Sequence, residues 1–146
     1  MERIYTQNDI QAIARDILAN IELQEKQGHI IALEGDLGAG KTTLTKTLAR
    51  ELGIDQEITS PTFVVAKSYE TNGSDFTKVT HIDAYRIEDL SELKGIGFAE
   101  LLQDPKTLII VEWPELIAPA ITEHPHLDWY TISHIDETTR KITKKI

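Results

Sequence analysis

Cysteine is absent from this chain of 146 residues, and its absence removes several classes of chemistry at once. Without thiols, disulfides, thiolate metal sites and cysteine nucleophiles are all excluded. Long apolar runs are missing too, since no stretch approaches the roughly twenty apolar residues that a membrane-spanning helix needs. The first residues, Met1 to Tyr5, also lack the apolar core of a secretory signal. We therefore expect a cytoplasmic protein with no membrane partner.

Positive charge is scarce, with 15 lysines and arginines against 24 aspartates and glutamates and a formal net charge of −9. Binding along a nucleic-acid backbone relies on clustered basic side chains, so this balance argues against DNA as a partner and against a broad direct contact with RNA. The basic segment Arg140 to Lys145 is a local exception, and we expect a solvated end there rather than a docking patch. The length fits a single domain over residues 1–146.

A glycine-rich stretch from Gly35 to Thr43, GDLGAGKTT, follows the pattern G-x-x-x-x-G-K-[ST]. It lies between the apolar run 29–33, typical of a buried strand, and the segment 42–52, which has helical spacing. Glycines let successive backbone N–H groups turn toward a phosphate, and the start of a helix adds unpaired N–H groups and partial positive charge. The pattern predicts a nucleoside triphosphate site in which Lys41 reaches the phosphates and the Thr42 hydroxyl ligates Mg²⁺.

The remaining segments predict an α/β fold of the P-loop NTPase type, with three α/β/α layers and a mixed central sheet. A capping box at 6–9 opens a helix over 10–21, and a second helix or two short turns should occupy 90–102 around Gly95 and Gly97. Strand-like runs occupy 30–33, 63–69, 76–82, 108–112, 129–135 and 140–146. Asn72-Gly73 predicts a hairpin, and three prolines within 114–125 predict mostly irregular chain.

Two acids stand where apolar strands end, Asp83 and Glu112. Ligands of open α/β sheets lie beyond the carboxyl ends of the strands, so either acid could hold the metal or orient the attacking water. The hydroxyls of Thr59, Ser60 and Thr62 are candidates for sensing the γ-phosphate, and a plain turn is the alternative. We expect His81 to be a hydrogen-bonded structural residue rather than a proton relay.

Four blocks together resemble the TsaE family, formerly YjeE, of bacterial P-loop ATPases. They are residues 35–43, Ser60-Pro61-Thr62-Phe63, His81-Ile82-Asp83-Ala84-Tyr85-Arg86 and Val111-Glu112-Trp113, in the family's order and approximate spacing. The first block is generic to P-loop proteins, whereas the four together are specific and cover nearly the whole chain. The resemblance implies an ATPase, with ATP and Mg²⁺, required to make N6-threonylcarbamoyladenosine on tRNAs that read ANN codons. It also implies TsaD and TsaB as partners, with tRNA reached only through their complex.

Site residues follow from the resemblance by matching position. The phosphate-binding residues would be Gly38, Ala39, Gly40, Lys41, Thr42 and Thr43. Thr42 and Glu112 would hold Mg²⁺, and Asp83 would be a catalytic or metal-linked acid, which with Lys41 and Glu112 makes the catalytic set. Trp113 would act beside the nucleotide or a partner, and Arg140 would contact the nucleotide. Ile10 departs from the family, which commonly has Thr there, so a polar contact to adenine at that position is not implied.

Two other function classes stay open on the residues alone. A small-molecule kinase usually has a lid with clustered arginines that stabilise the transferred phosphoryl group. The arginines of this chain are instead spread from Arg3 to Arg140, which is an argument against a kinase. A GTPase is disfavoured because no Asn-Lys-x-Asp run is present to read guanine. A nucleotide-gated binding module without significant hydrolysis would need the same loop. ATP turnover with and without the TsaB–TsaD assembly discriminates that module from an ATPase.

Overall fold

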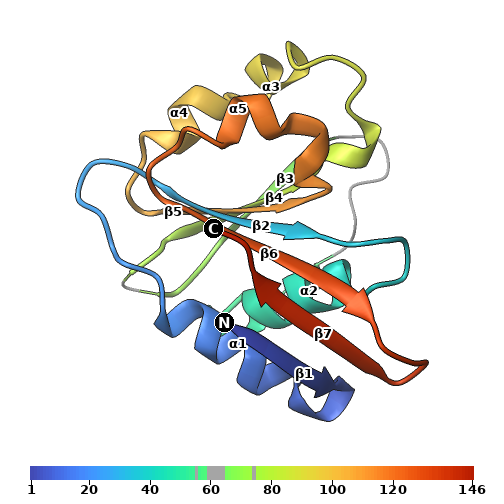
Figure 1. Ribbon diagram of the computed structural model, residues 1–146. Coiled ribbons are helices and arrows are strands. Elements are labelled where there is room, and N and C mark those ends of the chain that lie inside the picture. The colour runs from blue at the N-terminus through green and yellow to red at the C-terminus, as the bar shows by residue number, and fades with distance from the viewer. Residues whose placement is uncertain (55, 59–64, 74) are drawn as a thin grey trace.

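The computed structural model describes residues 1–54, 56–58, 65–73 and 75–146. These residues form a seven-stranded sheet in the order β1-β7-β6-β2-β5-β4-β3 (Figure 1). The strands are β1 (Glu2–Thr6), β2 (His29–Glu34), β3 (Ala66–Glu70), β4 (Lys78–Asp83), β5 (Thr107–Glu112), β6 (Leu127–His134) and β7 (Thr139–Lys144). The sheet is mixed, as the sequence predicted: β2 runs parallel to β5 and β6, and β4 runs parallel to β5. Antiparallel pairs β3–β4, β6–β7 and β1–β7 complete it.

The central strands β2 and β5 are apolar on both faces because both faces are covered. Ile31 and Leu33 of β2 point into one hydrophobic core, while Ile30 and Ala32 point into the other. Such continuous apolar runs are typical of buried parallel strands. The parallel arrangement brings the carboxyl ends of β2, β4 and β5 to the same edge of the sheet. That edge is where the candidate site is built.

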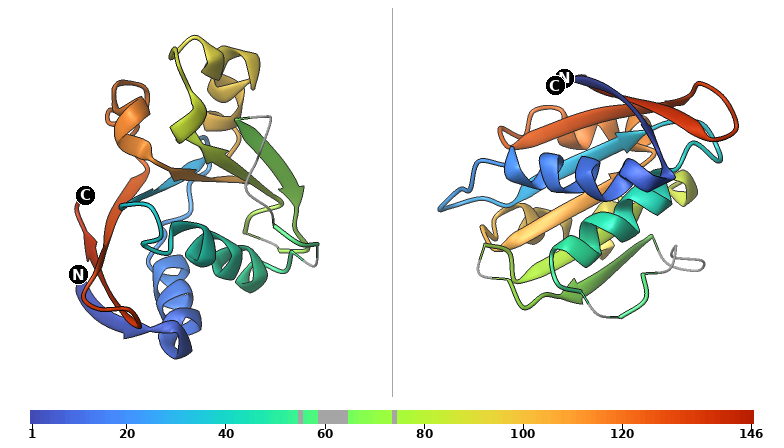
Figure 2. Two further views of the ribbon diagram at one scale, coloured as in Figure 1. Left: turned by 90° about the vertical axis from the view of Figure 1, so that its right-hand side faces the viewer. Right: turned by 90° about the horizontal axis from the view of Figure 1, so that it is seen from below.

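Helices cover both faces, which confirms the predicted three layers (Figure 2). One face carries α1 (Ile10–Ala19) and α2 (Lys41–Glu51), and the other carries the short helices α3 (Glu92–Gly95), α4 (Phe98–Leu102) and α5 (Ala118–Ile121). The predicted capping box precedes α1, where the Thr6 N–H donates to the Asp9 carboxylate at 3.1 Å. The predicted interruption between α3 and α4 is also present, since Gly97 adopts a φ of +70°.

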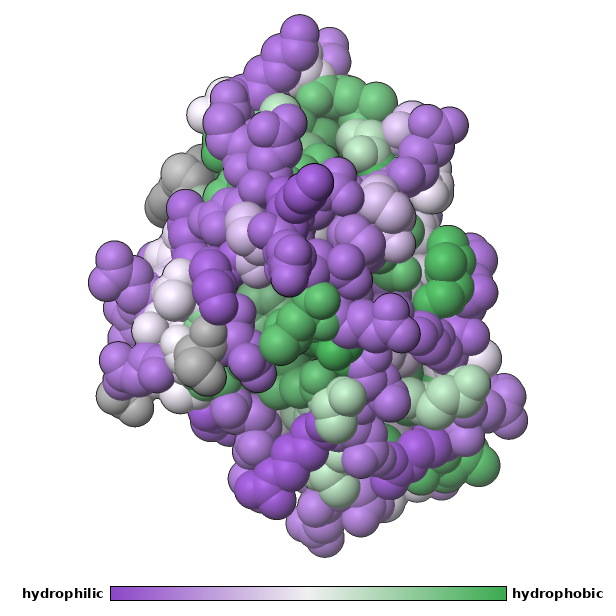
Figure 3. Space-filling view, turned by 90° about the vertical axis from the view of Figure 1, so that its left-hand side faces the viewer, coloured by the Kyte–Doolittle hydropathy of each residue, from purple (hydrophilic) through white to green (hydrophobic). Residues whose placement is uncertain are grey.

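The exterior is predominantly polar on the face shown in Figure 3, where hydrophobic residues gather only in small separate areas. Exposed apolar side chains such as Ile4 and Leu23 occur outside the two cores, as is normal for folded domains. Within the described ranges, no helix has both the length and the apolar character needed to cross a membrane.

The two ends of the chain differ from the sequence prediction. Residues 2–6 form the edge strand β1, which was not predicted because only Tyr5 of the strand is buried and its apolar pattern is too short. The basic segment 140–145 was expected to be a solvated end, and this is wrong for residues 140–144, whereas Lys145 is exposed. Residues Thr139–Lys144 form β7, which lies between β1 and β6 with Ile142 fully buried. The predicted return of this segment as a last strand is confirmed.

The proline-containing segment after β5 is more regular than expected. Residues Pro114–Ile117 form a 3₁₀ turn, and α5 follows directly, so the prediction of irregular chain was wrong. Pro114 is the first residue of the 3₁₀ turn, and Pro119 is the second residue of α5. A missing N–H costs nothing there, because the first N–H groups of a helix have no acceptor within it. Ile117 and Ile121 then enter the second core.

Candidate functional site

The glycine-rich segment connects the end of β2 to the start of α2 and has the backbone that its glycines allow. Gly38 and Gly40 adopt φ values of +77° and +106°, in the left-handed region that favours glycine. A Cβ on Gly35 would lie 2.6 Å from the carbonyl oxygen of Ile132, so the loop can pass β6 only with glycine there. Gly40 caps α2, whose first N–H groups have no acceptor within the helix. The loop thus has the backbone conformation that its glycines were expected to allow, and phosphate binding by it stays a prediction.

Lys41 lies folded over this loop and is only 5% exposed. Its ammonium donates to the carbonyl oxygens of Gly35 at 2.5 Å and Asp36 at 2.9 Å. It also lies 4.2 Å from the centroid of the Trp113 ring. Burial lowers the pKa of Lys41 below its ordinary value, and the negative charge of Glu112 opposes that shift. The ammonium is thus weakly hydrated and close to the loop where a phosphate would bind.

Thr42, Glu112 and His81 form a continuous chain of hydrogen bonds across the sheet edge. The Thr42 hydroxyl donates to Glu112 Oε1 at 2.7 Å. The other carboxylate oxygen of Glu112, Oε2, lies 2.5 Å from His81 Nε2. Both His81 and Glu112 are almost fully buried, at 1% and 3% exposed. The prediction that His81 is hydrogen-bonded is confirmed, and its partner is the predicted metal-binding acid.

Asp83 lies beside Glu112, because β4 and β5 are paired in parallel with these two residues in register. A pocket of about 420 Å³ is lined by Lys41, Thr42, Asp83, Glu112 and Trp113, together with loop residues. The three predicted catalytic residues and the two predicted metal ligands therefore lie around one space, although their chemical roles stay predictions.

The aromatic wall of this pocket contains Trp113, which spacing alone could not place. Its ring lies 5.0 Å from the ring of Tyr85. Trp113 adopts a φ of +59°, and among the described residues other than glycine it alone has a positive φ. A left-handed backbone is costly for a bulky residue and is often found where function requires it.

The side-chain oxygen atoms at this edge are of the kind that could ligate a magnesium ion bound together with a nucleotide. Mg²⁺ prefers hard oxygen ligands and usually keeps waters and phosphate oxygens alongside one or two carboxylates. The Thr42 hydroxyl and the Glu112 carboxylate already meet, with Asp83 on the adjacent strand. In the described part of the chain, no cluster of three or more histidines, cysteines or acids could hold a metal ion by itself. A magnesium ion at this edge would therefore need phosphate oxygens and waters as further ligands.

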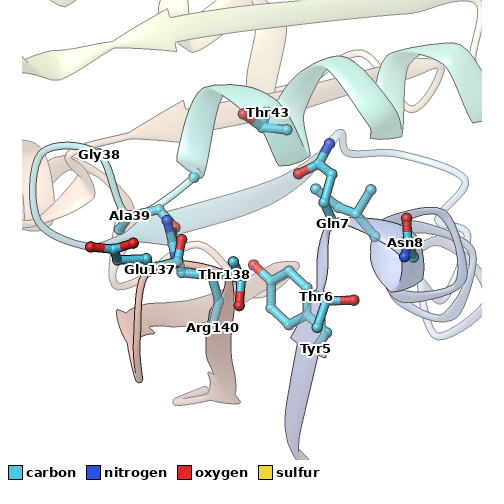
Figure 4. A pocket seen from close by; sticks show the side chains of 12 residues that line it. Tyr5, Thr6, Gln7, Asn8, Gly38, Ala39, Thr43, Glu137, Thr138 and Arg140 are labelled. Carbon is cyan, nitrogen blue, oxygen red and sulfur yellow. Dashed lines mark hydrogen bonds between the residues drawn. The ribbon is translucent and has the colours of Figure 1, made fainter.

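A second pocket, of about 550 Å³, lies on the other side of the loop (Figure 4). Residues from the N-terminal segment line one side of it, and Gly38, Ala39 and the turn between β6 and β7 line the other. Arg140 connects the glycine-rich loop to the turn between β6 and β7. Its Nε donates to the Ala39 carbonyl oxygen at 3.1 Å, and its Nη1 donates to the Asp136 carbonyl oxygen at 2.9 Å. Arg140 therefore braces the loop from 101 residues away in sequence.

Several lining residues of this second pocket were not predicted. They are Tyr5, Thr6, Gln7, Asn8, Glu137 and Thr138. No sequence pattern indicated them, because the strand β1 was not predicted. The pairing of β1 with β7 is what brings the N-terminal segment close to the turn between β6 and β7. Ile10 lines the same pocket with an apolar side chain. Thr59, Ser60 and Thr62 lie outside the described residues.

Comparisons with known proteins identify the family of this chain. The family model described as "Threonylcarbamoyl adenosine biosynthesis protein TsaE" matches residues 4–143. The chain is 40% identical over 99 residues to the tRNA threonylcarbamoyladenosine biosynthesis protein TsaE of Streptomyces coelicolor, covering 67% of this chain and 65% of the relative. It is 44% identical over 92 residues to the protein of that name from Bacillus subtilis, covering 63% and 54%. The alignments thus span about half to two thirds of the length of these curated relatives.

A solved structure extends the likeness to the whole fold. The crystal structure of Bacillus subtilis YdiB superposes with a TM-score of 0.65 at 31% sequence identity, covering 99% of this chain and 83% of the other. The family match spans nearly all of the described strands and helices, from β1 to β7. On these grounds the chain belongs to the TsaE family.

Proposed function

We propose that this protein binds ATP with Mg²⁺ and hydrolyses it in support of N6-threonylcarbamoyladenosine formation on tRNAs that read ANN codons. The contact between the Thr42 hydroxyl and Glu112 Oε1, beside the loop and Lys41, is the observation that carries the proposal. This contact would bring the bound phosphates and the magnesium ligands to one point. The family membership supports the pathway.

Binding would use both pockets that flank the loop. The phosphates would rest on the backbone N–H groups of Gly38 to Thr43, with the Lys41 ammonium turning from the loop carbonyls to the β- and γ-phosphates. The base and ribose would occupy the second pocket, where Arg140 borders the loop. The two pockets share Gly38, Gly40 and Thr43, so one extended ligand can reach both.

Hydrolysis would depend on charged groups that the fold already holds around the position of the γ-phosphate. Bound Mg²⁺ would neutralise charge on the β- and γ-phosphates. Thr42 and Glu112 would hold it, and Lys41 would stabilise charge that develops on the phosphoryl oxygens. Asp83 lies in the same pocket and would orient water or the metal's hydration shell. Partly buried groups suit this task because they are less screened by solvent.

The family also supports a partner-dependent role. We propose that the protein acts in the cytoplasm with TsaB and TsaD, which perform the transfer onto adenosine, and that it meets tRNA only through their complex. The net charge of −9 supports this indirect contact, since a strongly acidic chain repels a phosphate backbone. A kinase is less well supported, because Arg3 and Arg15 form ion pairs with Asp16 and Glu51 and do not line the pocket that contains Lys41 and Glu112.

Substitution of Glu112 by Ala tests the proposal. The variant should still bind ATP, because Lys41 and the loop are intact, and should lose Mg²⁺-dependent phosphate release measured in the presence of TsaB and TsaD. Glu100→Ala, which removes an exposed acid of α4, serves as the control and should behave as wild type. Normal turnover by Glu112→Ala would refute the assigned role. ATP binding without turnover by the wild-type protein and its partners would favour the nucleotide-gated binding module.

A further inference from the structure

Two buried histidine–carboxylate pairs bridge neighbouring strands at opposite edges of the sheet. His81 of β4 pairs with Glu112 of β5 at 2.5 Å, at the carboxyl edge of the parallel strands. His29 of β2 pairs with Asp128 of β6 at 2.7 Å, at the amino edge. The two pairs share chemistry and burial, whereas only the first touches the candidate site. This difference provides both a hypothesis and its control.

The first pair fixes the direction of the Glu112 carboxylate. A carboxylate oxygen accepts hydrogen bonds, so His81 Nε2 carries the proton and donates to Oε2. Thr42 of α2 donates to Oε1 from the other side. Glutamate has three side-chain torsions, and two donors from different elements leave the carboxylate a single orientation. Oε1 is the oxygen directed at the hydroxyl that would ligate magnesium.

We propose that His81 is a positioning residue for the magnesium that accompanies the nucleotide. It does not line the pocket and is 1% exposed, so it acts only through Glu112. Groups that orient a metal ligand typically change metal affinity by about 10–100-fold when they are removed. This inference rests on the proposed function and predicts one property of it: the concentration of Mg²⁺ that the site requires.

The experiment measures binding of the fluorescent nucleotide mant-ADP to the full chain, first in EDTA and then across a MgCl₂ titration. His81→Leu removes the donor. His81→Gln keeps an N–H near the position of the histidine Nε2, while His81→Asn keeps an amide that is too short to reach Glu112. His29→Leu is the matched control, because it breaks the other buried histidine–carboxylate pair, at the far edge of the sheet. Thermal unfolding of each variant reports its folding.

The expected result is unchanged mant-ADP affinity in EDTA for all folded variants. His81→Leu and His81→Asn should need an Mg²⁺ concentration about 10–100-fold higher for the half-maximal change in mant-ADP binding. His81→Gln and His29→Leu should match the wild type in this respect. If His81→Leu does not fold, the difference in Mg²⁺ requirement between His81→Asn and His81→Gln tests the positioning role of His81.

An unchanged Mg²⁺ requirement in His81→Asn, or an equal rise in His29→Leu, would overturn the positioning role while leaving nucleotide binding intact. A wild-type protein that does not bind mant-ADP at all would instead refute the proposed function. The two failures are therefore distinguishable.

Discussion

Replacement of Lys41 by Met separates the ligand-binding role of this side chain from its effect on the fold. In the free protein the ammonium makes two hydrogen bonds to loop carbonyls and lies over the Trp113 ring. Their loss would cost about 3–6 kcal/mol at typical values for two hydrogen bonds from a charged group. Burial, which lowers the pKa of Lys41, shows that the charge also carries a desolvation cost that Met removes. We expect the free energy of unfolding to change by less than about 1.5 kcal/mol as these effects offset each other.

The effect on nucleotide binding should be much larger. Two charge-assisted hydrogen bonds to phosphates contribute about 1.5–3 kcal/mol each. Their loss corresponds to a fall in affinity of at least about 100-fold, because each 1.4 kcal/mol is tenfold. Isothermal titration calorimetry with ADP and urea unfolding of the same samples measure both quantities. An affinity within tenfold of wild type, or a loss of stability that accounts for the whole effect, would refute this role of Lys41.

Two further predictions concern other parts of the molecule. Nucleotide binding should change tryptophan fluorescence, because Lys41 must leave the ring of Trp113, and the change should disappear in Trp113→Phe; persistence of the signal would contradict the movement. Asp128→Asn should lower the free energy of unfolding by about 1–3 kcal/mol at pH 7. Burial alone would raise the pKa of the Asp128 carboxyl, but hydrogen bonds from His29 and Lys144 hold it below its ordinary value. The stabilisation is therefore complete above the unfolded-state pKa of about 3.9 and is lost as pH falls through the lower folded-state pKa. Urea unfolding of both proteins should show the difference shrinking below about pH 4, and a constant difference would contradict it.

The sequence predicted those parts of the fold that depend on local patterns. The loop glycines, the helix after Lys41 and the hairpin at Asn72-Gly73 each follow from chemistry within a few residues. The acids Asp83 and Glu112 were found by the same means, since both end apolar strands. Their mutual proximity followed once parallel strands were assumed, and the register confirms it.

Other features depend on pairings between distant parts of the chain. β1 is a short edge strand with only Tyr5 buried, and it becomes recognisable only when β7 is placed beside it. The contact of Arg140 with the Ala39 carbonyl follows from that same placement, so its geometry could not be read from a basic C-terminal segment. Trp113 required the left-handed turn after β5 to bring its ring over Lys41. Long-range order of the strands, rather than local propensity, decided these outcomes.

On the proposal above, one edge of the sheet holds both the phosphates and the magnesium of a bound nucleotide. A crystal structure of the chain with Mg²⁺ and a non-hydrolysable ATP analogue tests it most directly. We expect phosphate oxygens within hydrogen-bonding distance of the backbone N–H groups of Gly38 to Thr42, and the metal bound beside the Thr42 hydroxyl and Glu112. Phosphates bound away from this loop, or a metal remote from both Thr42 and Glu112, would show that the nucleotide binds elsewhere.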